Sequence, residues 1–388
     1  MKLAIEIVGR VGTEVRRMRK LLGLVALLAV SPCSIAASVQ DGPYLTRTVD
    51  NAWTARWVSG DDASPEVREE RVPASGEVTV AAVGALPAFK VKLRPAAKNA
   101  PSEVKLSATA PLFVMADTHG ELQIAVELLT RQKIIDSKLK WAFGKGHLAV
   151  LGDVFDRGPN HTEILWLLYK LEDEAKRAGG AVHVMLGNHE SMALGGDERY
   201  LNPKYLEVRD ALQAPNYAAL WGAETLLGQW LRTKSAVMKI GDYLCLHGGL
   251  SREVVERSLS LAAMDDSVRS SLGDRQPDGF VMSPNGPLWY RGYFPEAARG
   301  SGSAPATTED VEMILAFYKA RAIFVGHTIV PTVTSLYDGR VIAVQVYPHK
   351  EHPSSGSINE VAVMEALRVD GGKFFRARID GTLEPLAR

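Results

Sequence analysis

The stretch LAVLGDVFDRG (residues 148–158) joins a continuous apolar run to a loop that carries two carboxylates and an arginine. A run without polar residues predicts a strand that is buried on both faces. Apolar residues at helical spacing follow at 162–177, so this part of the chain predicts a strand, a polar loop and a helix in succession. We therefore expect an α/β core, with functional residues in the loop at the carboxyl end of this strand.

Four other parts of the sequence repeat this pattern of an apolar run that ends in a polar, glycine-containing loop. The five runs are residues 112–116, 148–151, 182–186, 243–246 and 322–325. The side chains just after them that could bind a metal ion are Asp117, His119, Asp153, Asn188, His247 and His327. Because loops at the carboxyl ends of strands converge, these six side chains are predicted to form one site.

Carboxylate, amide and imidazole ligands without cysteine suit Mn, Fe or Zn, and they disfavour a structural zinc site. A set of this size suits two ions about 3.5–4 Å apart, with one carboxylate between them. Asp153 stands midway in the series and is the expected shared ligand. Two such ions would activate a bridging water and hold two phosphoryl oxygens, and Arg157 would bind the remaining oxygens through its planar fork. The pattern therefore predicts hydrolysis of a phosphate ester.

Five motifs, taken in order, carry a resemblance to a known family. They are Asp-x-His at 117–119, Gly-Asp-x-x-Asp-Arg-Gly at 152–158, Gly-Asn-His-Glu at 187–190, His-Gly-Gly at 247–249 and Gly-His-Thr at 326–328. Together they resemble the calcineurin-like metallophosphoesterases, in particular the phosphoprotein-phosphatase branch and its bacterial Shewanella-like protein phosphatases. The resemblance spans roughly residues 112–345. It implies the fold of that family, an α/β (α+β layered) structure in which a β-sandwich is flanked by helices.

The resemblance also implies a role for each site residue. The first metal ion would be bound by Asp117, His119 and Asp153, and the second by Asp153, Asn188, His247 and His327. His189 would be the general acid that protonates the leaving oxygen, with Asp156 as its orienting partner. Arg157 would bind phosphate, and Arg291, in the segment PLWYRG (287–292), would be a second phosphate-binding arginine by a looser analogy.

The sequence leaves the substrate open. Serine/threonine phosphatases of the family carry Ser-Ala-Pro-Asn-Tyr after the last histidine ligand, but the similar APNY of this chain (214–217) precedes His247. Phosphotyrosine and phosphoserine or phosphothreonine proteins therefore all remain expected substrates. The alternative is a small-molecule phosphoesterase that acts on diadenosine tetraphosphate, nucleotides or phytate-like compounds. A non-catalytic binding protein is disfavoured, because every ligand and the expected acid are present.

Three regions are predicted along the chain. Residues 1–36 combine basic residues, a short apolar run and small residues, which is the composition of a cleaved secretory signal. Alternating strand patterns separated by turns predict a small β-rich unit at 40–106. The phosphoesterase domain would then occupy 107–388, with an insertion near 251–310.

The predicted signal and the charge balance bear on location and partners. We expect a periplasmic or secreted protein with no membrane attachment after cleavage, and an uncleaved membrane anchor is the alternative. The whole chain has 45 basic and 45 acidic side chains, a balance that gives no basic surface for nucleic acid. Beyond the predicted signal only Cys245 remains, so the mature protein can form no internal disulfide.

Overall fold

The computed structural model describes residues 38–61, 64–95, 98–275, 279–346 and 363–387. The predicted signal at 1–36 lies outside the described residues. Within the described ranges, no helix is long and apolar enough to cross a membrane.

The first of two six-stranded sheets carries the apolar runs that opened the sequence analysis. Its order is β17 (Leu383–Pro385), β16 (Lys373–Arg378), β15 (Glu365–Asp370), β7 (Leu112–Met115), β8 (His147–Val150) and β9 (Ala181–Val184). The strands β7, β8 and β9 are parallel, and β15 to β17 continue the sheet antiparallel. Every residue of β7 is buried, as its unbroken apolar sequence predicts.

The second sheet is also mixed. Its order is β13 (Thr334–Leu336), β14 (Val341–Ala343), β12 (Ala322–Val325), β11 (Tyr243–Leu246), β10 (Val237–Ile240) and β6 (Glu103–Val104). Tyr243 and Phe324 stack with their ring centroids 5.0 Å apart, and both meet Phe374 of the first sheet edge-on. The two sheets therefore pack face to face, and the predicted β-sandwich is confirmed.

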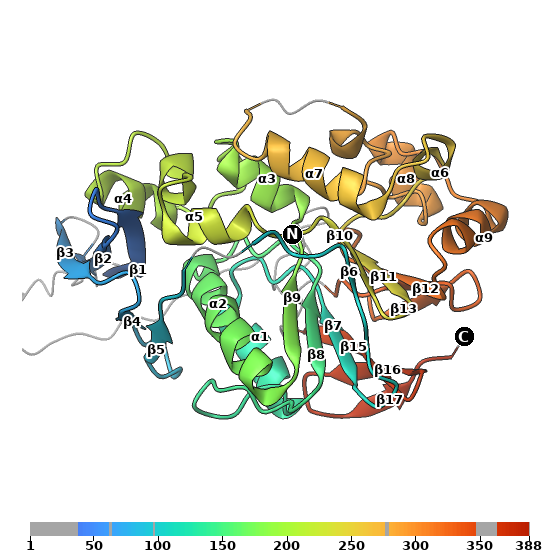
Figure 1. Cartoon of the computed structure of the whole chain (residues 1–388), viewed down its shortest axis with the longest axis horizontal. Coiled ribbons are helices and arrows are strands. Elements are labelled where there is room, and N and C mark those ends of the chain that lie inside the picture. Colours follow the sequence, from blue (N-terminus) through green and yellow to red (C-terminus); the bar gives the residue numbers. More distant parts are fainter. Residues whose placement is uncertain (1–37, 62–63, 96–97, 276–278, 347–362, 388) are drawn as a thin grey trace, which may run out of the picture. The chain divides into compact units, whose positions relative to one another are not determined.

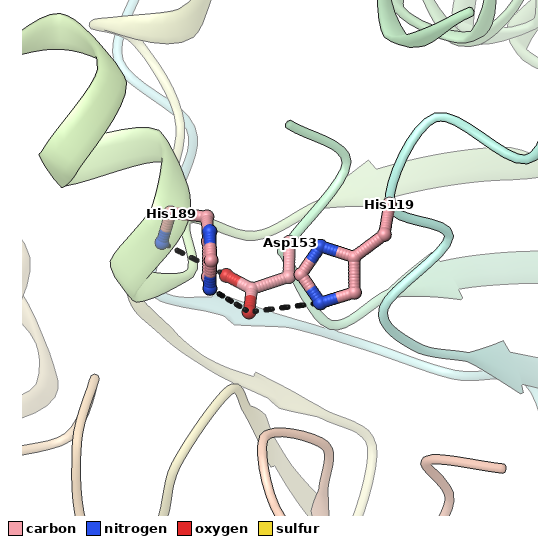
Figure 2. A group of neighbouring side chains, drawn as sticks. All are labelled: His119, Asp153 and His189. Atoms are coloured by element: carbon pink, nitrogen blue, oxygen red, sulfur yellow. Dashed lines mark hydrogen bonds and ion pairs between the residues drawn. The ribbon is translucent and has the colours of Figure 1, made fainter. Parts of the chain in front are cut away.

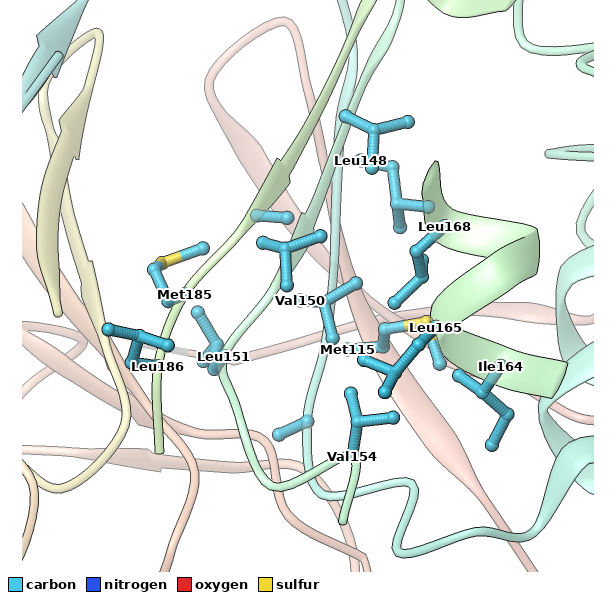
Figure 3. Packing of buried hydrophobic residues seen from close by; sticks show 14 of the residues in the cluster. Met115, Leu148, Val150, Leu151, Val154, Ile164, Leu165, Leu168, Met185 and Leu186 are labelled. Carbon is cyan, nitrogen blue, oxygen red and sulfur yellow. The ribbon is translucent and has the colours of Figure 1, made fainter. Parts of the chain in front are cut away.

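Helices α1 (Leu122–Arg131) and α2 (His161–Ala178) follow β7 and β8, and α2 is the helix predicted at 162–177. It packs along β9 (Figure 1). Figure 3 shows Ile164, Leu165 and Leu168 of α2 beside Met115 and Val150 of the strands, all in one buried cluster. These positions recur on one side of a helix, which is why this face of α2 is apolar.

The N-terminal strands form two smaller antiparallel sheets. One contains β1 (Ser38–Arg47), β2 (Trp53–Asp61) and β3 (Ser64–Val72), and the other contains β4 (Glu77–Val80) and β5 (Phe89–Lys92). Within the predicted β-rich unit, the alternating stretches at 53–58 and 89–93 form β2 and β5, and the β-branched stretch at 77–83 forms β4, which ends at Val80. The sequence did not predict β1 or β3, because β3 is an exposed, charged edge strand without an apolar alternation.

The remaining helices lie between and after the motif-bearing strands. They are α3 (Asn188–Leu194), α4 (Lys204–Ala211), α5 (Leu226–Leu231), α6 (Glu253–Glu256), α7 (Leu261–Ser271), α8 (Pro295–Ser301) and α9 (Thr308–Phe317), with short 3-10 turns at Tyr217–Trp221 and Phe280–Met282. The described part of 251–310, predicted as an insertion, contains α6, α7, α8 and the first turn of α9, joined by loops. The side chain of Asp265 fixes α7 to the second sheet, because it accepts the backbone N–H groups of Ala236 and Val237.

Candidate metal centre

All predicted site residues except Arg291 follow the ends of five strands, β7, β8, β9, β11 and β12, and they are brought together there. Their backbone is unusual, since six of them have left-handed φ angles between 42° and 70°: Asp117, His119, Asp153, Asp156, Arg157 and His327. A non-glycine residue in this region costs about 1–3 kcal/mol and persists only where the surrounding structure holds it. Most of the predicted site residues are therefore held in this unfavourable conformation, although other non-glycine residues of the described chain, such as Asn51 and Leu139, adopt it as well.

Asp153 is the centre of a first group of possible metal ligands. The ligand atoms of His119, Asp153 and His189 all lie within 4.8 Å of one another, and all three residues are buried. Asp153 Oδ2 is 3.7 Å from His119 Nε2 and 3.8 Å from His189 Nε2 (Figure 2). His189, the predicted general acid, thus lies as close to this carboxylate as a predicted ligand does.

Asp153 also belongs to a second group, with His247 and His327, whose ligand atoms again lie within 4.8 Å of one another. His247 Nε2 is 3.1 Å from Asp153 Oδ2, 3.1 Å from His327 Nδ1 and 2.8 Å from Asn188 Oδ1. The structure therefore places Asp153 in both groups, which is the position that the sequence assigned to the shared ligand.

Asp117 is buried next to the second group and is among the residues that line the cavity over the site. Its carboxylate accepts the backbone N–H of His327 at 3.2–3.3 Å, and its Oδ1 is 3.9 Å from His247 Nδ1. Burial raises the pKa of Asp117 to about 7. Asp117 is in neither group of mutually close ligand atoms, so its role as a ligand of the first metal ion stays a prediction.

The imidazoles are oriented as metal ligands are. His119 Nδ1 is 2.9 Å from the carbonyl of Phe155, and His247 Nδ1 is 2.8 Å from the carbonyl of Leu151. A carbonyl at Nδ1 holds the proton there and turns the lone pair of Nε2 toward the other ligands. In His327 it is Nε2 that is buried without a hydrogen-bond partner in the described structure. These donors fit metal ions.

The carboxylates around His247 favour a positive charge on its ring. Burial lowers the pKa of His247, but the nearby Asp153 and Asp117 outweigh it and raise that pKa to about 9. The oxygens of Asn188 and Asp153 both face Nε2, which would be unfavourable for a neutral imidazole that carries its proton on Nδ1. Either a second proton or a cation resolves this, and the donor types present are those of Mn, Fe and Zn sites.

His189 and Asp156 form a hydrogen-bonded pair beside the ligand groups. His189 Nδ1 is 2.6 Å from Asp156 Oδ2, and both side chains are buried. Burial lowers the pKa of His189, but the carboxylates of Asp153 and Asp156 more than compensate and leave it above its usual value. A protonated imidazole whose orientation is fixed by a carboxylate is suited to general acid catalysis.

A cavity of about 770 Å³ opens over these groups. Both predicted arginines line it, and Arg291 is fixed by hydrogen bonds from Nη1 to the carbonyl of His327 (2.8 Å) and to Thr328 Oγ1 (3.1 Å). The wall also includes Tyr200 and Trp289, which the sequence analysis did not single out. Trp289 lies within the quoted PLWYRG segment, whereas Tyr200 is in a polar loop without any signal.

Glu190 is the other residue whose role was missed. Its carboxylate accepts four backbone N–H groups at 2.6–3.3 Å, from Asp153, Val154, Phe155 and Gly187. It therefore fixes the loop that presents Asp153. Glu190 is the third residue of α3 and its carboxylate accepts the backbone N–H of the N-cap residue Gly187, but its bonds to the Asp153 loop join residues about 35 positions apart and have no local signal in the sequence.

Comparisons with known proteins agree with this geometry. Residues 110–331 match the calcineurin-like phosphoesterase family. The chain is 27% identical to Shewanella-like protein phosphatase 2 of Arabidopsis thaliana, over 53% of this chain and 63% of that protein. It is 26% identical to Shewanella-like protein phosphatase 1 of Plasmodium berghei, over 57% and 62% respectively. The chain thus spans less than two thirds of the length of these curated relatives.

One similar structure extends over nearly the whole chain. The crystal structure of the cold-active protein-tyrosine phosphatase of a psychrophilic Shewanella species is 34% identical, with a TM-score of 0.75. The match covers 89% of this chain and 99% of that chain. The resemblance carried by the five motifs is therefore confirmed, and the chain belongs to the calcineurin-like phosphoesterase family, in its protein-phosphatase-like group of metal-dependent enzymes.

Proposed function

We propose that this chain hydrolyses phosphate monoesters of phosphoproteins, with phosphotyrosine as the preferred substrate. The observation that carries the proposal is the position of Asp153 in two buried ligand groups, with the His189–Asp156 pair and two arginines beside them. The similar Shewanella structure is that of a protein-tyrosine phosphatase, which supports the choice of substrate.

Each side chain has a distinct task in this reaction. Two metal ions, when bound by the six predicted ligands, would supply Lewis acidity and an activated water. Arg157 and Arg291 would bind the phosphoryl oxygens through their planar forks and stabilise the charge that develops on them. His189 would donate the proton on Nε2 to the leaving oxygen, and Asp156 would hold the ring through Nδ1 and stabilise its charged form.

The position of Tyr200 is an argument for a substrate with an aromatic leaving group. Its ring lies 5.3 Å from the ring of His189, and 43% of the residue is exposed at the cavity. A leaving group that takes its proton from His189 would therefore lie next to an aromatic surface. Ring-to-ring contacts of this kind favour a phenol over an aliphatic alcohol by about 0.5–1.5 kcal/mol.

The test is a substrate panel with protein reconstituted separately with Mn, Fe and Zn. We expect the highest kcat/KM for a phosphotyrosine peptide, compared with a phosphoserine peptide, diadenosine tetraphosphate and p-nitrophenyl phosphate. Tyr200→Leu should lower the ratio of phosphotyrosine to phosphoserine turnover, whereas Tyr200→Phe should preserve it. Turnover of the dinucleotide alone would contradict the proposal and favour a small-molecule phosphoesterase.

Asp153→Asn tests the metal requirement. Because Asp153 belongs to both ligand groups, this variant should lose bound metal and activity together. The exposed Asp338→Asn is the control and should lose neither. Metal per chain, measured after reconstitution and desalting, should fall in parallel with kcat/KM. An Asp153→Asn protein that kept full activity would rule out a shared metal ligand at this position.

For location, we propose export to the periplasm or the medium, on the strength of the basic, apolar and small-residue pattern of residues 1–36. Fractionation of cells that express the full chain, followed by N-terminal sequencing, should find the protein outside the cytoplasm and beginning after Ala36 or Ala37. Recovery of uncleaved chain in the membrane fraction would favour an anchor instead.

A further inference from the structure

The backbone of Arg157 is held by one neighbouring segment. Arg157 N donates to the carbonyl of Tyr200 at 2.8 Å, and Asn202 Nδ2 donates to the carbonyl of Arg157 at 2.8 Å. Both backbone groups of this left-handed residue are therefore bonded to the segment that leads into α4. The position of Arg157 depends on the position of that segment.

Two residues at the start of α4 hold the same loop further along. The carbonyl of Pro159 accepts a hydrogen bond from Lys204 Nζ at 2.7 Å and another from Tyr205 OH at 2.9 Å. The Lys204 bond is charge-assisted, and such bonds are shorter and stronger than neutral ones. The loop that carries Arg157 is thus bonded to residues 200–205 at both ends.

Lys204 is in turn fixed by buried carboxylates from two other parts of the chain. Its Nζ is 2.6 Å from Asp41 Oδ2 of β1 and 3.4 Å from Glu163 Oε1 of α2. The side chains of Asp41 and Glu163 are 0% and 4% exposed, and that of Lys204 is 15% exposed. Tyr44 of β1 donates its hydroxyl to the other oxygen of Asp41 at 2.9 Å.

Moving the ion cluster of Lys204, Asp41 and Glu163 apart would cost free energy. Removing one member of a buried ion pair leaves an uncompensated charge in a medium of low polarity. Lys204 is therefore confined to the point where it meets Asp41, Glu163 and the carbonyl of Pro159 together. A displacement of β1 would move the ammonium group and, through it, the loop that carries Arg157.

We propose that Lys204 is a positioning residue, and that β1, through Asp41, sets the placement of the Arg157 loop and thereby the affinity of the cavity for phosphate. The inference rests on the proposed function, in which Arg157 binds the phosphoryl group. It assigns a task to the N-terminal sheet, which supplies one of the supports of the phosphate-binding loop.

The test compares charge-balanced variants. The assays are run at pH 8, above the pKa of about 7 to which burial raises Glu163. At this pH, Lys204→Met combined with Glu163→Gln removes one buried charge of each sign, so the net charge of the cluster is unchanged. Lys170→Met combined with Glu174→Gln is the matched control, because Lys170 Nζ also meets a backbone carbonyl (Leu139, 2.6 Å) and a carboxylate (Glu174, 2.9 Å). Neither of these control contacts involves the Arg157 loop. Asp41→Asn is the milder variant, which keeps the Lys204–Glu163 contact.

The readouts are the affinity for inorganic phosphate by calorimetry, KM and kcat for p-nitrophenyl phosphate, and metal per chain. We expect the Lys204→Met/Glu163→Gln protein to bind phosphate on the order of tenfold more weakly, with a raised KM and unchanged metal content. Asp41→Asn should act in the same direction by a smaller factor, and it provides the test if the double variant does not fold. The control variant should match the wild type.

An Arg157→Met background separates positioning from general stability. If Lys204 acts through Arg157, its replacement should weaken phosphate binding no further once Arg157 is gone. An equal loss in both backgrounds, or no loss in a folded Lys204 variant, would overturn the inference. Absence of ester turnover in the wild type would instead contradict the proposed function, because phosphate binding is measured without turnover.

Discussion

At the scale of single residues, His189 is set apart from the other imidazoles by its partner. His119 and His247 direct Nδ1 to backbone carbonyls, whereas His189 directs Nδ1 to the carboxylate of Asp156. A carbonyl partner holds a proton on Nδ1 and leaves Nε2 to face the other ligands, whereas the carboxylate partner of His189 favours the charged form of its ring. This difference in partners is what the predicted roles require, with His119 and His247 as ligands and His189 as the acid.

His189→Asn should keep its metal ions and lose rate. We expect kcat to fall by roughly 10²–10⁴-fold with an alkyl phosphate and by less with p-nitrophenyl phosphate, because a good leaving group needs no proton. The comparison of the two substrates, with metal content measured in parallel, checks this. His183→Asn in β9 is the control, since His183 bonds to His147 away from the site. A full rate on the alkyl phosphate would remove His189 from the role of acid.

Glu190→Gln tests the support of the Asp153 loop. An amide keeps one acceptor oxygen and places an NH₂ group against backbone donors, so some of the four bonds to Glu190 must break. Loss of such a supporting partner typically costs 10–100-fold in metal affinity or activity, and we expect about that loss here. The measurement is a metal titration, and Glu127→Gln, on the exposed side of α1, is the control. Unchanged metal affinity would mean that the loop holds its shape without Glu190.

At the scale of elements, helix α2 ends at a glycine in the left-handed conformation. Gly179 closes the helix with φ at 80°, and a Cβ there would meet only Lys145 Cγ at an ordinary 3.6 Å. Gly179→Ala should therefore destabilise the protein by about 1 kcal/mol through backbone strain alone. Gly300→Ala in α8, where φ is negative and the space is open, should be neutral or slightly stabilising. The free energy of unfolding of both variants, measured in urea, is the test. Equal effects of the two substitutions would contradict the strain argument.

At the scale of the whole molecule, the buried cluster between β1, α2 and α4 links stability to pH. Burial, and then the neighbouring Asp41, raise the pKa of Glu163 to about 7 from its ordinary value of 4.5. The folded protein therefore holds a proton that the unfolded chain releases between these two values. Stability from this group is fully present below pH 4.5 and is lost as the pH rises through 7, by up to about 3 kcal/mol.

Glu163→Gln should remove that loss. We expect the free energy of unfolding of the metal-free variant to fall less between pH 5 and pH 8 than that of the wild type. Urea unfolding in the presence of a chelator is the measurement, since metal affinity itself depends on pH. Glu69→Gln, on the exposed strand β3, should follow the wild type. Parallel pH profiles of wild type and Glu163→Gln would show that Glu163 is ionised in the folded protein.

The sequence by itself determined the elements whose burial is complete. The runs at 112–116, 148–151, 243–246 and 322–325 have no charged or strongly polar residue to place on a solvent face, so they could only be interior strands. The loops after them carry five of the six predicted ligands, and the sixth, Asn188, follows β9. The order of the motifs identified the family for the same reason, because each motif is a local run of residues.

Only the tertiary structure decided the contacts between parts that are distant in the sequence. Three contacts are examples: Tyr200 lies beside His189, Glu190 binds the Asp153 loop, and Lys204 lies between Asp41 and Glu163. They join residues up to 163 positions apart, and local periodicity does not encode such pairings. The sequence of β1 has no clear alternation of apolar and polar residues. This strand forms because it pairs with β2 and packs against the helices α2, α4 and α5. Candidate catalytic and metal-binding residues in local motifs can be predicted from the sequence, whereas the contacts that position these residues form only when the chain has folded.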